Sequence, residues 1–352
     1  MPGVRCREGR FRKELGLSSD HGLRGRLLEL ALGAGFHRAG FVDPKLAETA
    51  ASRVPQGAAG LEWEWITEAR RWSRSSSVLV CCLSCLRQEP NDLGSPGNPH
   101  ALVAPFARAH YYRQAVALLR AVVHRLEEET GLTRGSVRLF SNSRLPERAL
   151  LAATGLAAFG RNGFAIVPGL GSMFVIAGAV LPVPMAEASP AEPAPDPCGS
   201  CRRCRGACPV GAIHEPYRVQ RARCLQALAA SPEPWSADLM ERWGVRLYGC
   251  QECQAVCPHN ADLREPARPA VGEIGPSLPL LGLLSDDDGS RRARFRGTAL
   301  GMSWLPPAAL LRNAAVAAGN RREPVVREAL RLHQAHASEA VRTSIEWALS
   351  RC

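Results

Sequence analysis

Apolar residues in the first half of the chain follow two periods, one typical of strands and one typical of helices. Ser77–Leu83 is a compact apolar run of strand type, and Tyr111–Thr130 carries apolar residues at helical spacing before a stop at Gly131. Further strands are predicted at Ser136–Phe140, Phe164–Val167 and Met173–Val180, and a second helix at Leu145–Thr154. This mixture predicts an α/β fold for the first half of the chain.

The last part of the chain predicts helices only. Three are expected, at Pro306–Ala318, Pro324–Ala335 and Glu339–Ser350. Gly319-Asn320 is expected to separate the first two, and Ser338 to cap the third. Short paired helices without strands resemble about one unit of a HEAT-type repeat.

Composition marks the boundaries between these parts. Ala186–Pro197 is rich in Pro, Ala and Glu and is expected to be a linker, and a cysteine-rich block follows it to about Asn260. We therefore predict three domains. They are an α/β domain over residues 1–185, a cysteine-rich domain over 186–275 and a helical tail over 276–352.

The chain of 352 residues is basic, with a formal net charge of +11 from 44 basic and 33 acidic residues. Such an excess favours polyanionic partners, nucleic acid above all. Only Lys13 and Lys45 are lysines, so the arginine excess is equally consistent with coding bias. Charge alone therefore leaves a nucleic-acid partner open.

Thirteen cysteines indicate metal binding in a reducing compartment rather than disulfides. A chain of this length can bury an adequate core without disulfide bonds. Met1–Arg26 lacks the apolar segment of a signal peptide. Asn162–Ala186 carries no charge, but Pro and Gly interrupt it, which suits strands and turns better than a membrane-spanning helix. A cytoplasmic protein without a membrane span is expected.

The first cysteine motif is Cys198-Gly-Ser-Cys201-Arg-Arg-Cys204-Arg-Gly-Ala-Cys208-Pro209, with the C-x2-C-x2-C-x3-C-P spacing of bacterial ferredoxins. Three thiolates two residues apart can wrap around three corners of a cubane. The fourth begins the next helical turn and faces away, so it ligates the other cluster.

A second, altered copy follows as Cys250-Gln-Glu-Cys253-Gln-Ala-Val-Cys257-Pro258. It lacks the third close cysteine, and Cys224 stands upstream to fill that vacancy. Exchange of the last cysteine of each motif then predicts two 4Fe–4S clusters. The predicted ligands are Cys198, Cys201, Cys204 and Cys257 for the first cluster, and Cys208, Cys224, Cys250 and Cys253 for the second.

Structural zinc is the main alternative for these cysteines. Zinc sites favour two separated C-x2-C pairs over a continuous four-cysteine run, so the spacing favours iron–sulfur clusters. Cys81, Cys82 and Cys85 lie on or just after a predicted strand and are expected to be small buried hydrophobic residues.

Several further segments carry a resemblance to a known family. They are Glu147–Asn162, Gly171-Ser-Met-Phe174, Arg294-Phe-Arg-Gly-Thr-Ala299 and Leu311–Asn320, with the isolated Arg223-Cys224 and the block Leu247–Asn260. Together with the cysteine motifs they resemble the epoxyqueuosine reductases over about residues 60 to 350. These are cobalamin-dependent iron–sulfur enzymes that act on the wobble nucleoside of transfer RNA, and they are related to the reductive dehalogenases.

This resemblance implies an oxidoreductase that reduces epoxyqueuosine to queuosine in transfer RNA, or that acts on a related substrate. It implies a nitroreductase-like domain that binds cobalamin and a ferredoxin-like domain that passes electrons to cobalt from a donor such as flavodoxin or ferredoxin. It also implies a tail whose arginines help to bind transfer RNA. Asn162, Gly171 and Ser172 are carried over as cofactor-side residues.

Gln251 and Glu252 are further candidates for the cofactor side because they lie between two ligand cysteines. From that position they can face the corrin. Simple exposure to solvent is the alternative for both.

Two departures from the family lie at the implied site of chemistry. The family's catalytic Asp stands six residues before a Glu, and here the segment is Ser141-Asn-Ser-Arg-Leu-Pro-Glu147, so Ser141 takes the place of the acid. The family's Asp-Tyr-His becomes Tyr111-Tyr112-Arg113. A serine hydroxyl cannot supply a proton at neutral pH as a carboxylic acid does. Either Tyr111 or Glu147 then serves as the acid, or the substrate differs.

Three hypotheses therefore stay open. The first is a cobalamin and iron–sulfur reductase, and the second is an electron-transfer protein whose α/β domain only docks a partner. The third is an RNA-binding protein with structural clusters.

Overall fold

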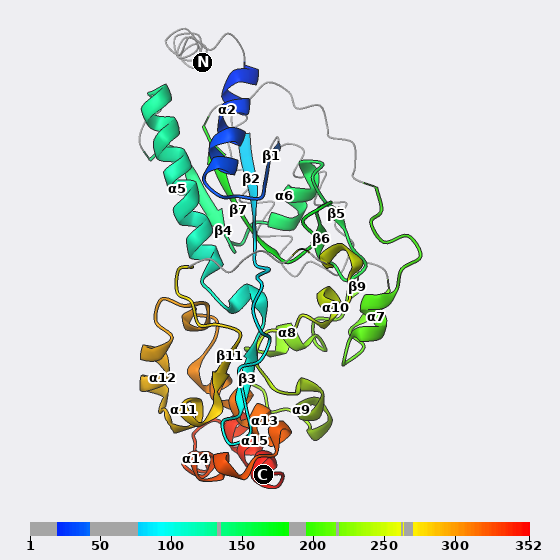
Figure 1. Ribbon diagram of the computed structural model, residues 1–352, viewed down its shortest axis with the longest axis vertical. Helices are drawn as coiled ribbons and strands as arrows, with labels where there is room; N and C mark the ends of the chain where they lie inside the picture. Colours follow the sequence, from blue (N-terminus) through cyan, green and yellow to red (C-terminus); the bar gives the residue numbers. More distant parts are fainter. Residues whose placement is uncertain are drawn as a thin grey trace. The chain divides into compact units, whose positions relative to one another are not determined.

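The computed structural model describes residues 20–42, 77–131, 135–182, 195–215, 218–261, 263 and 270–352 (Figure 1). The chain forms two compact units. Unit 1 comprises Met1–Ser84, Tyr112–Gly160 and Phe164–Gly199, and unit 2 comprises Cys85–Tyr111, Arg161–Gly163 and Ser200–Cys352. Most of the expected linker Ala186–Pro197 lies outside the described residues.

Unit 1 is built on a four-stranded antiparallel sheet with the strand order β1-β2-β7-β4. Its strands are β1 (Arg38–Val42), β2 (Ser77–Ser84), β4 (Arg138–Ser141) and β7 (Phe174–Leu181), and β5 (Ala158–Phe159) pairs with β6 (Ala165–Ile166). Its helices are α2 (Asp20–Gly33), α6 (Glu147–Ala153) and α5 (Tyr111–Thr130), whose first residue belongs to unit 2.

The central strand β2 is buried along its whole length. Val80 and Cys82 pack with Leu150 of α6 in one core, and the alternating residues Leu79 and Cys81 point to the other face, where they are equally buried. The burial of Cys81 and Cys82, and of Cys85 after the strand, confirms that these cysteines are core residues.

Most elements predicted in unit 1 are confirmed with small shifts at their ends. The predicted strands correspond to β2, β4, β6 and β7, and the predicted helices to α5 and α6. The stretch Asn162–Ala186 forms β6 and β7 as far as it is described. No helix among the described residues is both long and apolar enough to cross a membrane. Helix α2 and strand β1 were not predicted.

Unit 2 combines a three-stranded sheet, in the order β10-β3-β11, with helices packed around α13. Its strands are β3 (His100–Val103), β8 (Ile213–Glu215), β9 (Arg218–Val219), β10 (Arg246–Tyr248) and β11 (Ser277–Pro279). Its helices are α7 (Arg203–Ala207), α8 (Leu225–Leu228), α9 (Ala237–Trp243), α10 (Glu252–Ala255), α11 (Leu280–Ser285), α12 (Asp288–Arg294), α13 (Pro307–Arg321), α14 (Arg327–Arg331) and α15 (Glu339–Leu349). Short 3-10 turns are η1 (Pro105–Ala107), η2 (Pro258–Asn260), η3 (Ala299–Gly301) and η4 (Pro324–Val326).

The sheet of unit 2 joins three distant parts of the chain. β3 pairs in parallel with β10 of the cysteine-rich block and antiparallel with β11 at the start of the tail. A single hydrophobic core runs through the cysteine-rich block and the tail. The division into three domains stays a prediction, but the segments assigned to its second and third domains pack as one unit.

The predicted break at Gly319-Asn320 is wrong. α13 runs through both residues to Arg321 and ends at Arg322, whose φ is 57°. Gly319 is needed inside the helix because α15 lies too close for a side chain, and a Cβ there would come within 2.6 Å of Trp347. The side chain of Asn320 is used within the fold, where it donates to two carbonyls of the segment around α9.

The other two tail helices are only partly as predicted. The segment Pro324–Ala335 forms η4 followed by the short helix α14. α15 begins after Ser338, as expected, but the Ser338 hydroxyl makes no capping hydrogen bond.

The close packing of α13 on α15 predicts opposite effects for two glycine substitutions. Gly319→Ala is expected to lower the free energy of unfolding by about 1–3 kcal/mol, because the new methyl group meets Trp347. Gly25 lies in helix α2, where an added Cβ would meet no atom within 4 Å outside the helix's own backbone. Gly25→Ala is therefore expected to leave the free energy of unfolding unchanged or to raise it by up to about 1 kcal/mol. Thermal unfolding of both variants tests this, and equal midpoints would contradict the close approach of the helices.

Candidate iron–sulfur centre

The part of the first cysteine motif that follows Cys198 lies against the second motif in unit 2. α7 carries Cys204 of the first motif, α10 carries Cys253 of the second, and the two short helices pack together. All the cysteines of both motifs are half-buried. Exchange of cysteines between the motifs requires this proximity.

Four other thiols lie around that of Cys253. Burial raises the pKa of the Cys253 thiol well above its ordinary value, and the neighbouring thiols of Cys250, Cys224, Cys204 and Cys208 raise it further. Thiolates are the metal-binding form, so several of them can share this space only if a cation compensates their charge. The irons of 4Fe–4S clusters provide that charge, and the donor set therefore fits such clusters.

Three of the four cysteines predicted for the second cluster share one further feature. Cys208, Cys224 and Cys250 all pack against the hydrophobic core of unit 2. The Ala212 amide donates to Cys208 Sγ at 3.2 Å, and hydrogen bonds to sulfur are among the factors that tune the potential of an iron–sulfur cluster. The division of the eight cysteines between the two clusters stays a prediction. Cys198, which is predicted to bind the first cluster, belongs to unit 1.

Helix α13 holds the segments that present these cysteines. Arg312 stacks over Trp235 with its Cζ 3.8 Å from the ring centroid and donates to the Ala229 carbonyl at 2.9 Å. Asn313 donates to the same carbonyl at 3.0 Å and to that of Leu247 at 2.9 Å. Ala229 lies five residues after Cys224 and Leu247 three before Cys250. Sequence reasoning missed this role, although two polar residues within an apolar helix are a signal of it.

Among the described residues, no three His, Cys, Asp or Glu side chains converge closely enough to hold a single metal ion. A cubane does not need such convergence, because its four thiolates bind four different irons. The thiolates of one zinc ion would all lie about 2.3 Å from the same point.

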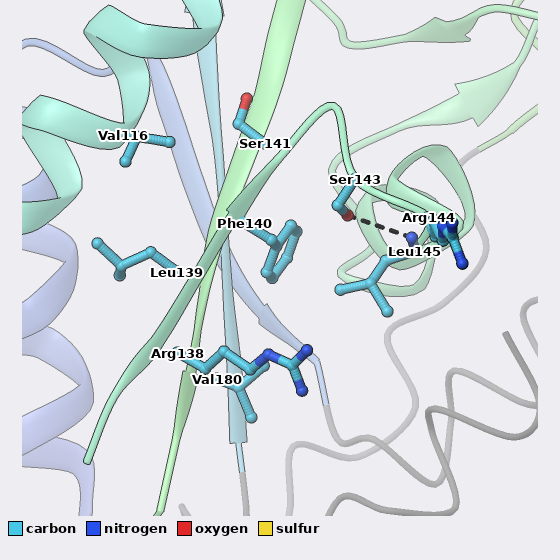
Figure 2. A pocket seen from close by; sticks show the side chains of 9 residues that line it. All are labelled: Val116, Arg138, Leu139, Phe140, Ser141, Ser143, Arg144, Leu145 and Val180. Carbon is cyan, nitrogen blue, oxygen red and sulfur yellow. Dashed lines mark hydrogen bonds between the residues drawn. The ribbon is translucent and has the colours of Figure 1, made fainter. Parts of the chain in front are cut away.

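The loop that begins at Ser141 borders a cavity in unit 1 (Figure 2). The cavity has a volume of about 400 Å³ and is lined from β4, from the loop after it and from Val116 of α5. Ser141 is one of the residues that line it, and its hydroxyl donates to the carbonyl of Ile176 at 2.7 Å. Ser141 is therefore already engaged with the sheet and is no substitute for an acid.

Glu147 is tied to this cavity through Ser143, which is one of the residues that line it. Glu147 Oε1 accepts hydrogen bonds from the Ser143 amide at 2.7 Å and from the Ser143 hydroxyl at 3.0 Å. Asn142 supports the tight turn between them with a φ of 50°. Burial raises the pKa of Glu147 to about 7, although the hydrogen bonds from Ser143 oppose this shift. Glu147 is therefore partly protonated at neutral pH.

Tyr111 is the weaker of the two candidate acids. Its ring is buried, with the Arg87 guanidinium 5.2 Å from the ring centroid. Burial raises the pKa of its hydroxyl further above its ordinary value, and this hydroxyl has no hydrogen-bond partner among the described residues. A proton held that tightly is not released at neutral pH.

The residues carried over for the cofactor side fall into two groups. In unit 2, the buried Asn162 donates to the Cys253 carbonyl at 3.4 Å, and the half-buried Gln251 and Glu252 line a cavity of about 440 Å³. Glu252 also forms an ion pair with Arg246. These residues thus lie beside the cluster cysteines.

The other two lie in unit 1. Gly171, with a φ of 72°, closes a turn by exchanging hydrogen bonds with Val167 at 2.8 and 2.9 Å, and Ser172 beside it is buried. A contact of any of the five residues with cobalamin stays a prediction.

The comparisons with known proteins agree on one family. Residues 197–260 match the family model described as a 4Fe-4S double cluster binding domain. The chain is 32% identical over 277 residues to an epoxyqueuosine reductase of Burkholderia pseudomallei, with 71% of this chain and 66% of that enzyme aligned. It is 30% identical over 267 residues to one of Alicycliphilus denitrificans, with 71% of each chain aligned.

A solved structure shows the same fold along nearly the whole chain. It is an epoxyqueuosine reductase with an epoxyqueuosine-modified tRNA-Tyr stem loop, 22% identical, with a TM-score of 0.78 and coverage of 95% of this chain and 91% of that one. The centre thus holds two 4Fe–4S clusters in a mixed α/β protein.

Removal of Cys224 is expected to cost one cluster. Anaerobically purified protein should contain about eight irons per chain, and Cys224→Ala about four, because the second cubane loses a ligand. Cys352→Ala, at a buried cysteine outside both motifs, should keep all of them. Iron analysis of the two variants measures this, and a full iron content in Cys224→Ala would exclude Cys224 as a ligand.

Proposed function

This chain belongs to the epoxyqueuosine reductase family, and on that premise we propose that it reduces epoxyqueuosine to queuosine in transfer RNA. The observation that carries the proposal is the double-cluster motif within an alignment that extends well beyond it. The reaction consumes two electrons and two protons, and it converts the epoxide to an alkene and water. The clusters supply the electrons, and the chain must supply at least one of the protons.

Cobalamin is the group that we propose as the immediate reductant. Within unit 1, Ser172 carries a hydroxyl, a group that suits the amide arms of a corrin, and Gly171 allows close approach of the backbone. When bound, cobalamin supplies a strongly reducing metal centre, while the protein binds and orients it. A nitroreductase-like fold for unit 1 is part of the same proposal.

Glu147 is the proton donor in this proposal. When it is protonated, its O–H can donate to Ser143 Oγ across the 3.0 Å that separates them. The Ser143 hydroxyl is then free to donate into the cavity that it lines. A carboxylic acid with a pKa of about 7 is well matched to this task at neutral pH.

The helical tail supplies features that suit transfer RNA. Arg292, Arg294 and Arg296 are exposed on or just after α12, and Trp304 is an exposed aromatic side chain nearby in sequence. Arginines neutralise phosphates, and an exposed indole can stack on an unpaired base. A HEAT-like character of the tail belongs to this proposal. A cytoplasmic location belongs to the same proposal, because it suits both transfer RNA and reduced thiolates.

A purely electron-transferring protein is the second candidate, and the loss of the family's acid at Ser141 favours it. Corrin binding separates the two. Protein reconstituted under reducing conditions is expected to retain about one cobalt per chain, as proposed for a cobalamin enzyme. A protein with full clusters and no corrin would support the second candidate.

Nucleosides of transfer RNA test the substrate directly. A strain that lacks the chain is expected to accumulate epoxyqueuosine and to regain queuosine when the gene is restored. Unchanged queuosine in the deletion strain would remove this substrate.

The proposed proton donor predicts a specific pH profile. The active form carries the proton, so the rate is expected to be highest below pH 7 and to fall as the pH rises through the Glu147 pKa of about 7. Glu147→Gln should lower the rate about 10²- to 10⁴-fold and remove this fall, because it cannot give up a proton. Single-turnover rates measured from pH 5.5 to 9 would show both effects.

Two further variants control this experiment. Glu128→Gln, at an exposed position of α5, should leave the profile unchanged. Ser141→Asp in the Glu147→Gln background should recover part of the rate by restoring an acid at the cavity edge. An unchanged rate and profile in Glu147→Gln would show that another group supplies the proton.

A further inference from the structure

Six arginines surround the loops that present the cluster cysteines. Residues 200–225 contain these six arginines and a single acidic residue, Glu215. All six side chains are exposed, and we call this set the arginine face: Arg202, Arg203, Arg205, Arg218, Arg221 and Arg223.

Hydrogen bonds join the two segments that carry the arginine face. β8 pairs with β9, and the Gln220 amide donates to the Ala212 carbonyl at 2.8 Å. α7, with Arg203 and Arg205, packs on β8. Arg223 and Cys208 line a common hollow of about 460 Å³. The arginines thus belong to one continuous part of unit 2.

Little acidic charge offsets this face. Asp238 lies at one end, where its hydrogen bond to Arg242 and its attraction to Arg223 hold its pKa below the usual range. Arg242 already neutralises that carboxylate, with Nε 2.8 Å from Oδ2. The charged side chains that the structure describes in residues 200–225 are therefore mostly basic.

We propose that the arginine face is the docking surface for an acidic one-electron carrier protein. The proposal rests on the redox role of the clusters given above. The carrier gives up one electron, the cluster assigned to Cys198, Cys201, Cys204 and Cys257 gains it, and no covalent bond forms or breaks. Opposite charge steers such encounters and raises association rates by about 10- to 1,000-fold.

RNA is the competing occupant of a basic surface, and the composition of this one argues against it. RNA-binding surfaces combine arginines with exposed aromatic rings that stack on bases. Within the described part of residues 195–261 no large hydrophobic side chain is exposed, whereas Trp304 is exposed in the tail. The carrier, by contrast, must reach the cysteine loops themselves, and the arginines are interleaved with those cysteines.

The test is the second-order rate of cluster reduction by a reduced plant-type ferredoxin, an acidic one-electron carrier, without RNA or cobalamin. Arg202→Glu/Arg203→Glu/Arg205→Glu is expected to slow it about 10- to 100-fold at low salt. The difference should disappear near 0.5 M salt, where the screening length falls to about 4 Å. Reduced methyl viologen, a small cation, should react with the variant as fast as with the parent or faster.

Matched variants separate a local effect from a change in net charge or folding. Arg120→Glu/Arg125→Glu/Arg331→Glu changes net charge equally at exposed positions elsewhere and should keep the ferredoxin rate. Arg218→Glu/Arg221→Glu, on the second segment, should slow it without touching the first motif. Iron content and the viologen rate confirm intact clusters in each.

Two results would overturn the proposal. One is an unchanged ferredoxin rate in both arginine-face variants with intact clusters. The other is equal slowing by the control triple variant. Weaker binding of a transfer RNA stem loop together with an unchanged ferredoxin rate would assign the face to RNA instead. Because the assay needs neither substrate nor corrin, it stays informative even if the proposed reaction is wrong.

Discussion

Mutual repulsion between thiolates is the constraint on which unit 2 depends. Cys253 has four other cysteines around it, and burial makes each negative charge there still more unfavourable. Iron ions offset this repulsion because they bind the thiolates and balance their charge. Cluster assembly and folding of this region are therefore coupled. Packing of Cys208, Cys224 and Cys250 against the main core of unit 2 extends that coupling to the helical tail.

The same reasoning explains why the tail and the cysteine-rich block form one body. α13 reaches both cysteine-bearing segments through the buried side chains of Arg312 and Asn313, and Asn320 does the same for the segment around α9. The tail therefore has two roles in this account. Its inner face holds the cluster ligands in position, and its exposed arginines and Trp304 are available to a nucleic acid.

Electrons and protons reach the proposed reaction from different parts of the chain. The exposed arginines of unit 2 lie close to the cysteines in sequence, which suits an acidic electron carrier. Unit 1 holds a carboxyl that is partly protonated at neutral pH, because the effect of burial on its pKa outweighs that of the hydrogen bonds from Ser143. Ser141 ends β4 and Glu147 begins α6, so the lost acid and the carboxyl with the raised pKa stand at the two ends of one connecting loop.

Sequence predicted those features that depend on local spacing. Sequence reasoning found the cysteine motifs, the helix Tyr111–Thr130 and the buried strand that begins at Ser77. Each of these features depends on the spacing of residues within one short segment. Features that depend on distant contacts were missed. Gly319 and Asn320 have the composition of a helix end, yet contacts with Trp347 and with the carbonyls of Met240 and Gly244 keep them helical. β3 was missed because its partners β10 and β11 lie more than a hundred residues away along the chain.

The assignment of ligands between the two cubanes is the central claim, and anomalous diffraction at the iron edge from anaerobic crystals tests it most directly. Two groups of four irons are expected, with Cys208 Sγ bound to the group that also binds Cys224, Cys250 and Cys253, and with Cys257 Sγ bound to the other. A map in which Cys208 and Cys257 ligate the cubane of their own motif, or ligate no iron, would contradict it.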